Sequence, residues 1–117
     1  MLIQAITIAD QRYSHYLKNS DFIQQYIFPG GCLPCPTEFR RQAEAAGLKV
    51  VDEFAFGRDY AETLRRWRHQ FLAARERVLP LGFDERFIRL WEFYLAYCEA
   101  AFDEGNTDVV QFTLQKA

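Results

Sequence analysis

The sequence has no glycine-rich turn of the kind that holds a nucleotide or another phosphate-bearing cofactor. None of its six glycines belongs to a G-x-G-x-x-G or P-loop pattern after a strand. A Gly-x-Ser-x-Gly motif is also missing, and neither of the two histidines stands near a plausible nucleophile. These absences argue against a complete nucleotide-dependent enzyme or serine hydrolase. We therefore expect the 117 residues to be the back end of a larger α/β enzyme.

The sequence also lacks a charge excess, a long apolar run and an even set of cysteines. Fourteen basic and 16 acidic side chains leave a net charge of -2, so we expect no nucleic-acid partner. The uncharged stretch 1–9 is far shorter than the roughly 20 residues of a membrane span and lacks the flanks of a signal peptide. Three cysteines without an export signal indicate reduced thiols and a cytoplasmic location.

The residues that are present predict a folded domain over 1–117. Half of them are hydrophobic and 16% are aromatic, which is too much apolar surface for a disordered chain. The hydrophobic spacing predicts strands over 2–8, 48–56 and 109–114, a short helix over 38–46, and two long amphipathic helices, over 58–78 and between Asp84 and Gly105. The order is β-α-β-α-α-β, and the fold class is α/β, or α+β for these residues alone.

The first strand is apolar on both faces apart from Gln4, which is typical of a central strand with neighbours on both edges. Gln4 is then either a buried amide satisfied by core hydrogen bonds or a ligand-facing amide at a strand end. Residues 9–36 show no clean period and end in a segment rich in proline and glycine, so they predict a long loop. Thr37 is the expected cap of the short helix that follows.

The long helix over 58–78 has an aromatic stripe and many arginines. Tyr60 begins the stripe, and on spacing alone it is the first core aromatic, followed by Leu64, Trp67, Phe71, Ala74 and Val78. The arginines lie among acidic residues, so ion pairs within the helix explain most of the pattern, with phospholipid head-group contact as the alternative. Cys32 and Cys35 have the spacing of a redox pair or of half a zinc site, but incidental loop cysteines are favoured because no second pair exists.

Three strings carry a family resemblance. They are Tyr-Ile-Phe-Pro-Gly-Gly-Cys-Leu-Pro at 26–34, Gly-Arg-Asp-Tyr-Ala-Glu-Thr-Leu-Arg-Arg-Trp at 57–67, and Phe-Ile-Arg-Leu-Trp-Glu-Phe-Tyr-Leu-Ala-Tyr-Cys at 87–98. The sequence resembles the C-terminal third of cyclopropane-fatty-acyl-phospholipid synthases and mycolic-acid methyltransferases. This implies the C-terminal portion of a class I S-adenosylmethionine-dependent methyltransferase fold, with the cofactor-binding half absent.

The resemblance also assigns positions within that fold. The first strand resembles the fifth strand of the methyltransferase sheet, the other two strands resemble its terminal antiparallel pair, and the two long helices form part of the lid over the acyl pocket. We therefore expect no cofactor on this chain alone, whereas S-adenosylmethionine and bicarbonate are implied for the complete enzyme.

The chemistry implied by the resemblance is methyl transfer from S-adenosylmethionine to the double bond of an unsaturated phospholipid acyl chain, after which a bound bicarbonate removes a proton. Gln4 falls where many members carry histidine, Ile6 falls on the position that supplies a backbone amide, and Tyr60 falls on the tyrosine of the bicarbonate site. These three are the candidate catalytic residues, while Cys98 stays a packed core thiol.

Two functional hypotheses follow. The first is an acyl-pocket and lid portion of such a methyltransferase, inactive alone. The second is a stand-alone interaction or lipid-binding module that forms a homodimer through the exposed edge of its first strand. Peripheral membrane contact is a further expectation.

Overall fold

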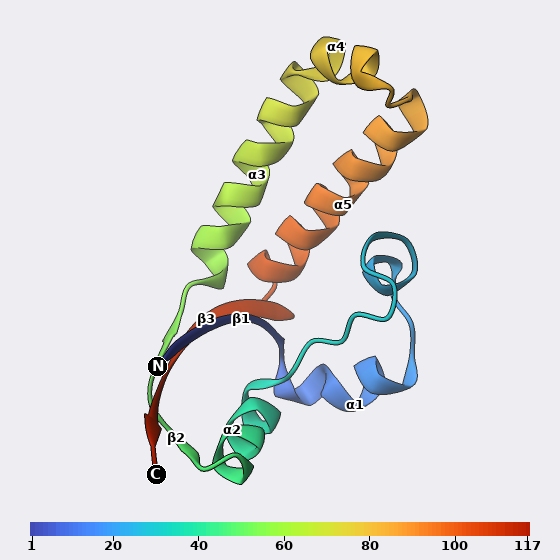
Figure 1. Cartoon of the computed structure of the whole chain (residues 1–117). Coiled ribbons are helices and arrows are strands. Elements are labelled where there is room, and N and C mark those ends of the chain that lie inside the picture. The colour runs from blue at the N-terminus through green and yellow to red at the C-terminus, as the bar shows by residue number, and fades with distance from the viewer.

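A three-stranded antiparallel sheet forms the base of the molecule, and a helical hairpin projects from it (Figure 1). The computed structural model describes all residues from 1 to 117. The strands are β1 (Leu2–Ile8), β2 (Leu48–Ala55) and β3 (Thr107–Lys116), in the order β1-β3-β2. The last strand in the chain is therefore the central one. Its residues 107–113 pair with β1 and its residues 110–116 pair with β2. The three predicted strands are confirmed.

The helices are α1 (Asp10–Lys18), α2 (Pro36–Ala45), α3 (Gly57–Ala73), α4 (Arg75–Val78) and α5 (Glu85–Asp103), with a π-helical turn, η1 (Ile23–Ile27), and a 3₁₀ turn, η2 (Leu79–Leu81). The predicted single helix over 58–78 is interrupted at Ala74, where the backbone leaves the helical region before α4 begins. The helix expected between Asp84 and Gly105 is confirmed as α5.

The expected loop over 9–36 is wrong over much of its length, because α1 and η1 lie within it. α1 is held by tertiary contacts and not by a strong apolar period of its own. Tyr16 is buried against Ile8 and Cys35, with Leu33 packed at the side of this small cluster. The backbone N–H of Leu33 also donates to the Tyr16 hydroxyl at 2.8 Å.

The cap of α2 is also different from the expected one. Cys35, not Thr37, occupies the N-cap position, and its Sγ accepts a hydrogen bond from the Glu38 N–H at 3.4 Å. The Thr37 hydroxyl instead donates to Asp10 at 2.9 Å, and the Thr37 N–H donates to the same carboxylate at 3.1 Å. The beginnings of α1 and α2 are therefore tied together.

Within this chain β1 is an edge strand, so the expected pair of neighbours is reduced to one. It pairs only with β3, and of its side chains only Thr7 and Ile8 are buried. The physical reason is that no strand lies along its second edge, where the Ile8 N–H donates to the Pro34 carbonyl at 2.9 Å. β2 is the opposite edge strand and carries a bulge between Val50 and Asp52.

The sheet has a helical layer on each face. On one face Phe112, which is fully buried, stacks on Phe39 of α2 with ring centroids 3.9 Å apart. On the other face Val109 belongs to the larger core cluster, whose remaining members come from the hairpin: Ala61, Leu64, Leu95, Cys98 and Phe102. Trp67 was expected in this core but is 47% exposed, because the hairpin has only two helices and each keeps an outer side.

The cap of α5 gives a modest stability prediction. The Asp84 carboxylate accepts a hydrogen bond from the Phe87 N–H at 2.9 Å, as the sequence predicts. Replacing Asp84 by alanine should lower the free energy of unfolding by about 1 kcal/mol, the usual contribution of an N-cap. Urea denaturation of Asp84→Ala and of Asp84→Asn tests this, because asparagine keeps the capping oxygen; equal losses in both variants would contradict the assignment.

Candidate functional site

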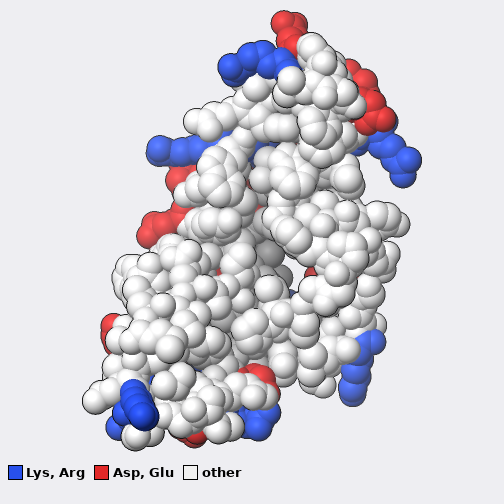
Figure 2. Space-filling view, in the orientation of Figure 1, with Lys and Arg blue, Asp and Glu red and all other residues white.

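A cavity lies between α5 and the segment that contains α1 and η1. It has a volume of about 730 Å³. Figure 2 shows this face hollowed beside the lower half of α5. Tyr94, Tyr97 and Cys98 of α5 form one wall, and Ile6 and Ile8 contribute from the end of β1. The wall is therefore mainly apolar and aromatic.

Of the three candidate residues, the structure places only Ile6 at the cavity. Gln4 and Ile6 alternate along β1 and pair with Gln111 and Val109 of β3, so both lie on the face that carries the hairpin. Gln4 is exposed, and its Oε1 accepts a hydrogen bond from Gln111 Nε2 at 3.0 Å. The buried-amide reading of Gln4 is therefore wrong, and both N–H groups of its amide remain free to donate.

Tyr60 lies in the first turn of α3 and packs against the larger core cluster. Its ring meets Phe102 edge to face with centroids 4.9 Å apart, and Phe102 is itself a cavity residue. Burial raises the pKa of the Tyr60 hydroxyl, and the nearby Cys98 thiol contributes in the same direction. The phenol is therefore a neutral hydrogen-bond donor at ordinary pH.

The start of α3 is fixed to β3 by one carboxylate. Asp108 Oδ1 accepts from the Gly57 N–H at 2.8 Å and from the Val109 N–H at 2.9 Å. A Cβ atom on Gly57 would lie 2.4 Å from that same oxygen, so the contact needs a glycine here. Sequence reasoning missed this anchor because the two partners are 51 positions apart. It sets the position of the helical turn that carries Tyr60.

Comparison with known proteins gives the family. The family model described as mycolic acid cyclopropane synthetase matches residues 1–112. The chain belongs to this family. The family resemblance of the three sequence strings is thereby confirmed.

Individual relatives show how much of such a protein the chain represents. It is 46% identical over 113 residues to the tuberculostearic acid methyltransferase of Mycobacterium tuberculosis, which covers 96% of this chain and 26% of that protein. It is 38% identical over 95 residues to the cyclopropane-fatty-acyl-phospholipid synthase of Escherichia coli K12, covering 81% of this chain and 24% of that protein. The chain spans about a quarter of the length of these two relatives.

Solved structures of the family share the fold. A mycolic acid cyclopropane synthase complexed with SAH and CTAB superposes with a TM-score of 0.85 at 30% identity, over 99% of this chain and 44% of that one. The cyclopropane synthase MmaA2 of Mycobacterium tuberculosis gives a TM-score of 0.86 at 26% identity, over 98% and 43%. The expected fold class, a C-terminal portion of the S-adenosylmethionine-dependent methyltransferase fold, is confirmed.

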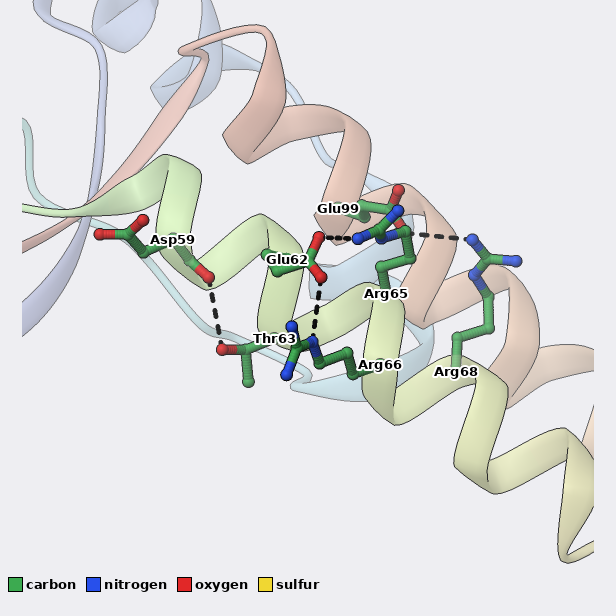
Figure 3. A network of polar contacts seen from close by, with 7 residues as sticks. All are labelled: Asp59, Glu62, Thr63, Arg65, Arg66, Arg68 and Glu99. Atoms are coloured by element: carbon green, nitrogen blue, oxygen red, sulfur yellow. Dashed lines mark hydrogen bonds and ion pairs between the residues drawn. The ribbon is translucent and has the colours of Figure 1, made fainter.

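Four of the eight arginines of the hairpin form ion pairs, three of which are drawn in Figure 3. Glu62 accepts hydrogen bonds from both Arg65 and Arg66 within α3. Arg68 reaches across the hairpin to Glu99 of α5 at 3.1 Å, and its pair is the least exposed of the set. The expectation of intrahelical ion pairs is thus correct for α3, and a pair between helices adds to it.

The three cysteines differ sharply in environment. Cys32 is exposed, while Cys35 and Cys98 are buried, and all three are free thiols. Burial raises the pKa of Cys98 from its ordinary value near 9 to about 11, and burial also raises the pKa of Cys35. The reading of Cys98 as a packed core thiol is confirmed.

No group of three or more potential metal-ligating side chains occurs, and no helix is long and apolar enough for a membrane span.

The environments of the three cysteines predict selective alkylation. With iodoacetamide at pH 8, Cys32 should be labelled in the native protein, and all three thiols should be labelled in denaturant, as mass spectrometry can count. Labelling of Cys98 at the rate of Cys32 would contradict the structure.

The raised pKa of Cys98 also predicts a pH dependence of stability. The folded chain holds the Cys98 proton more tightly than the unfolded chain does, so the free energy of unfolding should fall as the pH rises above the ordinary thiol pKa towards about 11.

Proposed function

We propose that this chain is the acyl-pocket and lid portion of an S-adenosylmethionine-dependent methyltransferase that modifies unsaturated phospholipid acyl chains. The observation that carries the proposal is the apolar cavity of about 730 Å³ beside α5, in a chain of this family. Its aromatic wall suits an extended acyl chain, which needs no hydrogen-bond partners. The activity requires a cofactor-binding half outside these 117 residues, so the chain alone should be inactive.

Gln4, Ile6 and Tyr60 are proposed as this chain's share of a bicarbonate site. Their chemistry is compatible with an anion, because the Gln4 amide has uncommitted N–H groups and the Tyr60 hydroxyl is kept neutral by burial. Ile6 follows Gln4 by two residues on β1, so the two side chains lie on the same face of the sheet. When bound, the anion supplies the base for proton removal, and these residues hold and orient it. A cytoplasmic location and peripheral membrane contact are part of the same proposal.

Joining the chain to a cofactor-binding half tests the proposal. The upstream part of the Mycobacterium tuberculosis tuberculostearic acid methyltransferase is fused in front of residues 1–117 in place of its own matching segment. We expect labelled methyl groups to pass from S-adenosylmethionine to vesicles of dioleoyl phospholipid with the fusion and not with either part alone. A fusion that folds and binds the cofactor but transfers nothing would refute the function. Saturable heat from S-adenosylmethionine and the isolated chain in calorimetry would refute its dependence on a second half.

One observation favours a second candidate, self-association of the chain through β1. The outer edge of β1 has no strand beside it, and Leu2 on that strand is 60% exposed. Unpaired backbone groups and apolar side chains together favour pairing with another strand. Sedimentation velocity over a range of concentrations distinguishes the two readings: a monomer throughout contradicts self-association.

A further inference from the structure

The cavity beside α5 is polar along one side, and α1 supplies that side. Arg12, His15 and Asn19 line it together with the buried Tyr16. Arg12, His15 and Tyr16 are spaced as one face of α1, and Asn19 is the residue that follows the helix. The hydrogen bond from the Leu33 N–H to the Tyr16 hydroxyl holds this face against the cavity wall. The cavity is therefore amphiphilic, with an aromatic wall on α5 and a basic border on α1.

The basic groups of this border are free to bind a ligand. Arg12 takes part in none of the six ion pairs of the molecule. It is also the only arginine among the cavity residues. The ring of His15 meets Asn19 at 3.4 Å through Nδ1, which leaves Nε2 available. A guanidinium and an imidazole one helical turn apart match the oxygens of a phosphate.

Two acidic residues of the same cavity limit the charge of that ligand. Asp21 accepts a hydrogen bond from the Gln24 N–H at 2.8 Å, and Glu104 follows the end of α5. Their negative charges repel a head group that carries several phosphates. They are compatible with a head group that has one phosphate and is otherwise neutral or cationic. The border therefore favours a single phosphate.

We infer that Arg12 and His15 bind the phosphate of a single-phosphate amphiphile whose apolar chain occupies the cavity beside α5. The inference rests on the proposed function, since it takes the cavity as an acyl site, and it adds the residues that select the head group. Arg12 donates through its guanidinium N–H groups and His15 through Nε2 when protonated there, while the α5 wall contacts the chain. Neither residue was a candidate on sequence grounds.

The test compares three probes on the 117-residue chain. Dodecylphosphocholine and dodecyl maltoside, both below their micelle concentrations, share one apolar chain and differ in the phosphate, and inorganic phosphate lacks the chain. Binding is followed by calorimetry and by amide chemical shifts of α1 and α5. We expect the phosphocholine probe to bind about 10-fold more tightly than the maltoside, as one charge-assisted contact allows. Inorganic phosphate should show no saturable binding at the same concentrations.

Matched variants complete the test. Arg12→Gln should remove the preference for phosphocholine and leave the maltoside affinity unchanged, which also shows that the variant is folded. Arg77→Gln removes another arginine without an ion pair, on α4 and away from the cavity, and should change neither affinity. Three outcomes would each overturn the inference without touching the proposed function. They are equal effects of the two variants, equal binding of the two detergents, and binding of free phosphate as tight as that of phosphocholine. Failure of both detergents to bind would instead count against the acyl cavity and the proposed function.

Discussion

Replacement of Tyr60 by phenylalanine should lower the methyl-transfer rate of the fused enzyme about 100-fold, the usual cost of losing one donor to a reacting anion. The ring should stay in place, because its edge-to-face contact with Phe102 at 4.9 Å does not use the hydroxyl. The loss should therefore appear in kcat, with little change in the KM for lipid. Radiolabelled methyl transfer to dioleoyl vesicles measures both.

Two controls separate this role from a structural one. Tyr13→Phe removes a hydroxyl from a half-buried tyrosine of the smaller core cluster, away from the hairpin, and should leave activity unchanged. Added bicarbonate should partly restore Tyr60→Phe, since a weakened anion site fills at higher concentration. A Tyr60→Phe enzyme within about threefold of the parent rate would exclude the hydroxyl from the anion site.

Most of the secondary structure could be predicted from the sequence because the signals are local. Asp84 caps α5 and Gly105 follows its end, and both features are visible in the order of residues alone. The alternation of β2 and the apolar run of β1 are equally local. What failed was α1, whose nine residues are mostly polar. The position of α1 depends on the hydrogen bond between the Leu33 N–H and the Tyr16 hydroxyl, and the hydrophobic spacing of the sequence does not reveal this contact.

The candidate site divides in the same way. Tyr60 and Ile6 were identified through the family resemblance, and the structure adds that Ile6 lines the cavity while Tyr60 contacts it through Phe102. The basic border of α1 could not be predicted, because Arg12 and His15 come to line the same cavity as α5 only when the chain folds. The same holds for Asp108, whose ordinary position in a strand hides its contact with Gly57.

Substitution of Gly57 by alanine should lower the free energy of unfolding by about 3 kcal/mol, by adding strain and removing a hydrogen bond. The new Cβ would lie 2.4 Å from Asp108 Oδ1 and 3.2 Å from Asp108 Cα, so the carboxylate must leave. Its departure leaves the N–H groups of Gly57 and Val109 without their partner. Urea denaturation, monitored by circular dichroism, measures the loss.

A double-mutant cycle with Asp108→Ala identifies the cause. If the carboxylate is the obstacle, alanine at 57 should cost clearly less in the Asp108→Ala background, because the hydrogen bonds are already gone and the nearest oxygen is absent. Strictly additive losses would show that the two residues act separately. Gly47→Ala is a matched control, since Gly47 has φ of +80° and open space around its missing Cβ, so its cost of about 1 kcal/mol is purely conformational and independent of Asp108. Coupling confined to Gly57 would establish that a strand residue fixes the helical turn on which Tyr60 stands.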